Sequence, residues 1–133
     1  AMEHHEFKNS DNVVVMKSVK HSMLFPHANL VITHGGHGTI IRALSYGLPI
    51  ICLPMGRDQD DNAIKVAIKG CGIKLSPKSS PRSIQKATEQ ILRDNKFKIN
   101  AKKMQVEINK PGSIEEVIAE INGLINKRKS VNI

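Results

Sequence analysis

Hydrophobic residues along the chain fall into short unbroken runs, separated by stretches with helical periodicity. The runs lie at residues 13–16, 30–33 and 49–53, and a weaker one, interrupted by Lys74, lies at residues 72–75. An unbroken apolar run is typical of a strand buried on both faces, and helical stretches between such runs are typical of parallel crossovers. The pattern therefore predicts an α/β fold, with a Rossmann-like parallel sheet and helices on both of its faces.

Start and stop signals divide the rest of the chain into helices. Apolar residues 40, 41 and 44 predict a helix that ends at Gly47, and a second predicted helix runs from residue 60 to Gly70. Further helices are predicted to start at Pro81, over residues 96–110, and at Ser113, which forms a capping-box pattern with Glu116. The expected organisation of residues 1–133 is a single domain. Residues 1–10 would be a disordered or cloning-derived start, 11–95 an α/β core, and 96–133 C-terminal helices.

The charge of the chain is uneven. Residues 1–64 carry 5 basic and 6 acidic side chains, whereas residues 65–133 carry 15 basic and 6 acidic ones. A basic half can bind nucleic acid or an anionic surface, but aromatic residues make up 3% of the chain, which leaves little surface for base stacking. The lysines fall on polar helix faces, so we expect a solvated surface and no nucleic-acid partner.

Cysteine content and hydropathy bear on the compartment. Cys52 and Cys71 lie in apolar surroundings, which favours buried free thiols over a disulfide. No apolar run approaches the length of a transmembrane segment, and the start of the chain lacks the apolar core of a secretion signal. These features predict a cytoplasmic protein with no transmembrane segment.

The strongest chemical signal is the glycine-rich run that follows the second predicted strand, His34-Gly35-Gly36-His37-Gly38-Thr39. A strand that ends in glycines and opens into a helix exposes free backbone N–H groups at the positive end of a helix dipole, which is suited to phosphate. We also weighed His34 and His37 as a metal pair. They are three residues apart without a clear third ligand, so no metal is expected.

A second polar cluster follows the third predicted strand and includes Asp58, Gln59, Asp60 and Asp61. The carboxyl ends of parallel strands meet at one edge of a sheet, so this cluster should lie beside the glycine run. We expect Asp60 and Asp61 to cap the helix that follows. The carboxylate of Asp58 and the amide of Gln59 suit sugar hydroxyls, and a phosphate beside a polyhydroxyl group describes a nucleotide sugar.

The spacing HGGxGT…AL…GxP…P…DQ…NA…GxG over residues 34–72 resembles the donor-binding domain of GT-B glycosyltransferases of the UDP-glucuronosyl/glucosyltransferase family. The resemblance covers residues 13–75, with compatible helices to the end of the chain. It implies the C-terminal, nucleotide-sugar-binding part of an enzyme that transfers a hexose to an acceptor hydroxyl or amine. The donor would be a substrate, UDP- or dTDP-linked, and no cofactor is implied.

The resemblance also implies roles for individual residues. His34 matches the histidine that approaches the donor diphosphate, and Asp58 and Gln59 match the pair that binds the sugar. The phosphates would lie against a cradle made by Gly36, His37, Gly38 and Thr39.

The nucleoside side departs from the family. Ser18 and His21 stand where the family has an aromatic residue and a glutamine for the base. Arg42 stands in place of a glutamate that contacts the ribose, and it could pair with another phosphate instead.

Full enzymes of this kind have two Rossmann-like domains, and the acceptor site and catalytic base lie on the N-terminal one. We therefore expect this chain to be inactive alone and to work with an acceptor-domain subunit, or as a homodimer that completes the sheet. Two alternatives stay open. One is a truncated or degenerate fragment without catalysis, and the other is a basic module that binds an anionic surface.

Overall fold

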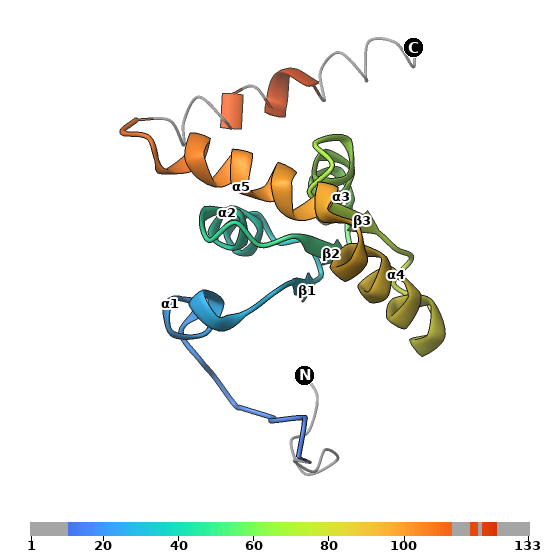
Figure 1. Ribbon diagram of the computed structural model, residues 1–133. Helices are drawn as coiled ribbons and strands as arrows, with labels where there is room; N and C mark the ends of the chain where they lie inside the picture. The colour runs from blue at the N-terminus through green and yellow to red at the C-terminus, as the bar shows by residue number, and fades with distance from the viewer. Residues whose placement is uncertain (1–10, 113–117, 120, 125–133) are drawn as a thin grey trace, which may run out of the picture.

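The computed structural model describes residues 11–112, 118–119 and 121–124 of the chain. Its sheet consists of three short parallel strands in the order β1 (Val31–Thr33), β2 (Ile50–Cys52) and β3 (Gly72–Lys74). Each strand leads into a helix, as Figure 1 shows. The strands predicted at residues 30–33, 49–53 and 72–75 are therefore confirmed.

The described helices are α1 (His21–Leu24), the 3₁₀ helix η2 (Phe25–His27), α2 (His37–Ser45), α3 (Arg57–Ile68), α4 (Pro81–Arg93) and α5 (Asn95–Asn109). The ends of α2 and α3 and the start of α4 agree with the predicted signals, but α3 begins before the predicted residue 60, and α1 and η2 were not predicted. Ser80 caps α4 through a bond to the Ser83 N–H, as its sequence pattern predicts. At the start of α5, the Asp94 carboxylate accepts a hydrogen bond from the Lys96 N–H, so this helix has a defined first turn.

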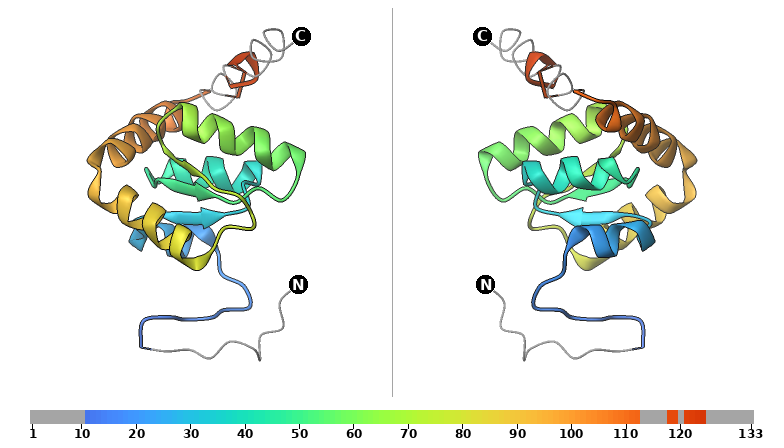
Figure 2. Two further views of the ribbon diagram at one scale, coloured as in Figure 1. Left: turned by 90° about the vertical axis from the view of Figure 1, so that its right-hand side faces the viewer. Right: turned by 90° about the vertical axis from the view of Figure 1, so that its left-hand side faces the viewer.

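Helices cover both faces of the sheet, which confirms the predicted layering. Ile50 and Cys52 point to the face covered by α2, α3 and α5, whereas Ile51 points to the face covered by α4 (Figure 2). All three side chains are fully buried. Because successive strand residues point to opposite faces, this unbroken apolar strand needs a helical layer on each side.

The strand predicted at residues 13–16 is wrong. This segment contains an isolated bridge at Val13 but no strand, and Val14 is 66% exposed. The described sheet ends at β1, and this segment does not pair with that edge. Apolarity favours a strand but cannot supply the partner that a strand requires.

Both cysteines are buried and free, as predicted. Burial raises the pKa of each thiol, Cys52 and Cys71 alike, to about 11. The helix predicted from Ser113 lies largely outside the described residues. Within its predicted range, the described residues 118–119 and 121–124 are helical. No helix in the described part of the chain is long and apolar enough to cross a membrane.

Candidate functional site

The candidate site lies where β1 and β2 end, and hydrogen bonds join the two loops that follow them. His34 Nδ1 lies 3.3 Å from the carbonyl oxygen of Leu53. The Asn62 side chain, from α3, donates to the carbonyl oxygen of Gly35 at 2.9 Å. The sequence places these partners 19 and 27 residues apart. The predicted phosphate and sugar segments are thus neighbours on one rim of the sheet.

Gly35 is the residue that lets the two loops approach so closely. Its φ of +94° is unfavourable for other residues, and a Cβ there would lie 3.1 Å from the backbone oxygen of Gln59. A side chain at this position would therefore strain the backbone and crowd the Gln59 backbone. The first glycine of the run is required by the fold itself.

The fold does not require glycine at positions 36 and 38, in contrast to Gly35. A Cβ at either position would meet nothing within 4 Å, and neither residue has a positive φ. Gly36 is the N-cap of α2 and forms no side-chain cap bond. The space in front of the first turn is therefore open, as close approach of a ligand to the backbone requires.

The first turn of α2 supplies the donors for such a ligand. The first bond within this helix runs from Ile40 N–H to Gly36 O at 3.0 Å. The amides of His37, Gly38 and Thr39 precede it and have no acceptor within the helix. The first turn carries no acidic side chain, so the positive end of the helix dipole is not neutralised from within the helix. This arrangement suits an anion.

His34 adds a side-chain group beside this turn. A carbonyl oxygen can only accept, so the contact with Leu53 places the ring proton on Nδ1. Nε2 is then the second polar atom of an exposed ring. It accepts a hydrogen bond when the ring is neutral and donates one to an anion when the ring is protonated.

The acidic residues at the start of α3 have separate surroundings. Gly56, not an aspartate, is the N-cap of this helix, so the predicted capping by Asp60 and Asp61 is wrong, although Asp60 does lie in the first turn. Asp60 instead pairs with Lys74 of β3 at 2.5 Å. Asp58 is exposed and has no side-chain partner among the described residues. Its carboxylate is therefore available to accept hydrogen bonds from hydroxyl groups.

Gln59 differs from its expected chemistry in one respect. Its Oε1 accepts a hydrogen bond from the Met55 N–H at 2.8 Å, which closes the loop before α3. The Nε2 group keeps its two donor hydrogens. Gln59 can thus donate to a sugar hydroxyl, while its oxygen holds the loop that presents Asp58.

The three residues expected on the nucleoside side do not meet in one place. His21 stacks on Phe25 with ring centroids 4.6 Å apart, and it lines a hollow of about 410 Å³ together with Thr39. Arg42 lines another hollow, of about 500 Å³, with His37 and Gly38. Ser18 is exposed and lines neither. Both hollows border the start of α2, and Thr39 and Arg42 are helical neighbours three residues apart.

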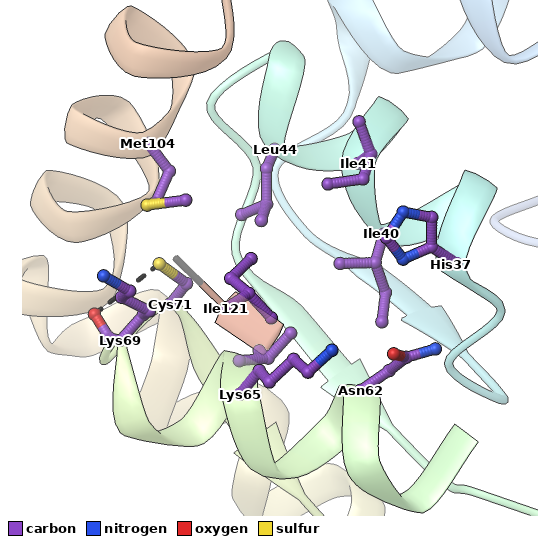
Figure 3. Close-up of a pocket in the computed structure, with 11 residues that line it drawn as sticks. His37, Ile40, Ile41, Leu44, Asn62, Lys65, Lys69, Cys71, Met104 and Ile121 are labelled. Atoms are coloured by element: carbon purple, nitrogen blue, oxygen red, sulfur yellow. Dashed lines mark hydrogen bonds between the residues drawn. The ribbon is translucent and has the colours of Figure 1, made fainter. Parts of the chain in front are cut away.

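A small apolar pocket lies behind the site, between α2, α3 and α5 (Figure 3). Its volume of about 30 Å³ is far below that of a nucleotide site. Burial lowers the pKa of Lys65 on its wall, and the negative charge of Asp61 opposes this shift. We assign this pocket to imperfect core packing.

Asn62 is the site residue whose role the sequence did not reveal. It belongs to the polar cluster, but its side chain supports the glycine loop and does not point to a ligand of its own. A signal was present, because Asn62 lies three and four residues after Gln59 and Asp58 on one helix. Residues at these spacings share a helix face.

Known proteins resemble this chain over most of its length. The family described as erythromycin biosynthesis protein CIII-like, C-terminal domain, matches residues 4–124. The 4'-demethylrebeccamycin synthase of Lentzea aerocolonigenes is 27% identical over 115 residues, which cover 86% of this chain and 27% of that protein. UDP-glycosyltransferase 2 of Phaeomoniella chlamydospora is 28% identical over 120 residues, 90% of this chain and 26% of that protein.

Solved structures agree with these relatives. The spinosyn rhamnosyltransferase SpnG, complexed with thymidine diphosphate, has a TM-score of 0.73 and 30% identity over 79% of this chain and 30% of its own. The spinosyn forosaminyltransferase SpnP has a TM-score of 0.75 at 24% identity, over 90% of this chain and 33% of its own, and supports the fold alone. The chain thus spans about a quarter to a third of the length of these proteins.

Proposed function

Because this chain belongs to the family of erythromycin biosynthesis protein CIII-like C-terminal domains of GT-B glycosyltransferases, we propose that its rim binds a nucleotide-sugar donor for glycosyl transfer. One observation carries the proposal. The unneutralised first turn of α2, with open space at Gly36 and Gly38, lies beside the unpaired carboxylate of Asp58 on two loops that are hydrogen-bonded together.

The roles of the residues follow from their chemistry. The amides of His37, Gly38 and Thr39, with the Thr39 hydroxyl, hold the diphosphate, and His34 Nε2 contacts it from the side. Asp58 accepts from sugar hydroxyls, and Gln59 Nε2 donates to them. The nucleoside lies beside the start of α2, near His21 or Arg42. Thymidine diphosphate is a candidate because the similar structure of SpnG is complexed with it, and uridine diphosphate is a candidate because one relative is a UDP-glycosyltransferase.

The reaction assigned to the complete enzyme moves a hexose from the donor to an acceptor hydroxyl or amine. The bond between the sugar C1 and the diphosphate oxygen breaks, a bond from C1 to the acceptor forms, and the acceptor loses its proton to a base. Negative charge develops on the departing diphosphate. Preorganised N–H donors at α2 stabilise that charge, which is an effective form of electrostatic catalysis. The acceptor site and the base come from a partner domain or subunit.

The edge of β1 is where we place that partner, or a second copy of the chain. Val31 N–H donates to Pro49 O, and Thr33 O accepts from Leu53 N–H, so both residues bond toward β2. In a parallel strand the intervening residue, Ile32, then directs its amide and carbonyl to the opposite side. Ile32 is also 49% exposed, although it lies in an apolar strand. An added strand would satisfy these groups and cover this side chain.

Calorimetric titration tests donor binding. UDP, GDP and dTDP, each free and with its sugar, are titrated into the chain and into His34→Ala and Asp58→Ala variants. We expect binding of at least one nucleotide and weaker binding by His34→Ala. Asp58→Ala should weaken only the sugar-linked ligands. No heat with any ligand would contradict the donor site.

Light scattering during size exclusion tests the partner at β1. A homodimer that dissociates in an Ile32→Lys variant supports pairing between copies. A monodisperse monomer at high concentration refutes pairing between copies of the chain at this edge.

A further inference from the structure

The first turn of α3 carries the sugar-binding pair, Asp58 and Gln59, and this turn has no capping side chain. The N-cap of the helix, Gly56, forms no side-chain cap bond. The first amides of a helix have no acceptor within it, and helix ends are the parts that fray. The position of the pair therefore depends on contacts that reach the first turn from outside the helix.

Three side-chain contacts hold this part of α3. The Gln59 side chain bonds within its own loop, and Asn62, nearly one turn later, bonds to the loop after β1. The third contact is the ion pair between the Asp60 carboxylate and the Lys74 amine, whose atoms are 2.5 Å apart. Of these three contacts, the ion pair is the one that joins the first turn itself to another strand.

The register of the sheet explains why Lys74 can reach this turn. Lys74 is the last residue of β3 and lies beside Cys52, the last residue of β2. From Cys52 the chain passes through residues 53–56 directly into α3. The amine of Lys74 therefore lies at the same rim of the sheet as the donor loops, and it meets the start of α3 from the side of β3.

We propose that Lys74 is a positioning residue that acts through Asp60, orders the first turn of α3 and so holds Asp58 and Gln59 for the donor sugar. The inference rests on the proposed donor site. A ligand that requires the ordered turn binds in proportion to the fraction of molecules in which the turn is ordered. The Lys74 and Asp60 side chains are 36% and 44% exposed, so solvent limits the effect of the pair to about fivefold.

Hydrogen exchange of the chain without ligand tests the ordering directly. The Asp60 N–H donates to Gly56 O at 2.9 Å, so its protection against exchange reports on fraying of the first turn. Lys74→Met removes the charge but keeps an apolar stem, and should lower this protection about twofold to fivefold. Lys74→Arg keeps the ion pair and should retain the protection of the parent chain. Lys78→Met removes an exposed lysine from the loop after β3 and is the matched control, which should also retain it.

A double-mutant cycle tests whether Lys74 acts through Asp60. Asp60→Asn should lower the protection of the amide at position 60, and Lys74→Met added to it should cause no further loss. Independent effects would multiply. A double variant that is clearly less protected than Asp60→Asn alone would therefore contradict action through Asp60.

Calorimetry then tests the connection between the turn and the sugar, with UDP-glucose compared with UDP and dTDP-glucose with dTDP. Lys74→Met should weaken the two sugar-linked ligands about twofold to fivefold and leave the free nucleotides unchanged, and Lys74→Arg should restore the parent affinity. Equal weakening of free and sugar-linked nucleotides would overturn the inference, because loss of a positive charge from the rim is sufficient to produce it.

The inference is also overturned if Lys74→Met matches Lys78→Met in both protection and affinity. Failure of the donor site itself gives a different result. In that case the parent chain binds none of the four ligands, and the proposed function fails. Lower protection in Lys74→Met would still assign the ordering of the first turn to Lys74.

Discussion

Replacement of Gly38 by alanine should make the protein more stable and its donor binding weaker. Gly38 lies in the first turn of α2, has no positive φ, and would place a Cβ where no atom lies within 4 Å. Alanine in a helix is favoured over glycine by about 0.5–1 kcal/mol, because the unfolded chain loses freedom and no contact is strained. With a urea m-value of about 2 kcal/mol/M, the unfolding midpoint should rise by about 0.25–0.5 M.

The same methyl group obstructs the ligand. A helical Cβ is tilted toward the N-terminus of its helix, which is the side from which a phosphate approaches the free amides. Loss of one charge-assisted hydrogen bond costs about 1.5–3 kcal/mol. Since 1.4 kcal/mol corresponds to a factor of ten, the dissociation constant of dTDP or UDP should rise roughly 10- to 150-fold.

A gain in stability together with a loss of nucleotide affinity distinguishes a glycine that serves binding from one that the fold requires. The matched control is Gly123→Ala, a helical glycine whose Cβ would also meet nothing within 4 Å and which lies outside the site. It should raise the urea midpoint similarly and leave calorimetric binding unchanged. If Gly38→Ala lowers stability, or if its nucleotide affinity stays within twofold of the parent chain, the cradle at α2 is refuted.

Three other perturbations test different parts of the structure. Gly72→Ala should lower the free energy of unfolding by about 3 kcal/mol or more, because its Cβ would lie 1.8 Å from Ile50 O; a loss below about 1 kcal/mol in urea denaturation would contradict this packing. Asn62→Ala removes a 2.9 Å bond between the rim loops, so it should cost about 1 kcal/mol in urea and also weaken nucleotide binding in calorimetry; unchanged affinity would argue against a shared rim. Burial raises the pKa of Cys52 and Cys71 from 9.0 to about 11, so the folded state holds its thiol protons longer than the unfolded state. The corresponding stability is complete below pH 9 and is lost as pH rises through 11, which a urea series over pH 8–11 would detect; a flat series would contradict it.

Local patterns in the sequence were sufficient for most of the fold. Unbroken apolar runs identified β1 and β2, a weaker run identified β3, and glycine or proline signals marked where the helices α2, α3 and α4 begin or end. Such signals depend on burial and on backbone conformation at each position, which neighbouring residues along the chain largely determine. The glycine run and the Asp58-Gln59 pair were located in the same way, because each follows a strand and opens a helix.

Pairing across the fold decided what those local signals could not. The apolar segment at residues 13–16 has the apolar residues of a strand, yet it does not pair with the edge of β1, and a strand forms only when it pairs with a neighbour. Asp60 is of a residue type that often caps helices, but it pairs with Lys74, which strand β3 brings within reach. The local sequence is the same whether the segment pairs as a strand or not, and whether the aspartate caps a helix or forms an ion pair, so the local sequence cannot distinguish these outcomes.

The candidate site likewise has features that the sequence predicts and features that depend on the tertiary structure. The sequence by itself determined that a phosphate-binding turn and a polar cluster follow neighbouring strands. Only the tertiary structure decided that Asn62 holds Gly35, that the Gln59 oxygen is engaged, and that His21 and Arg42 line different hollows. The physical reason is that motif spacing sets which chemical groups are present, whereas contacts between residues distant in sequence set which of them remain available to a ligand.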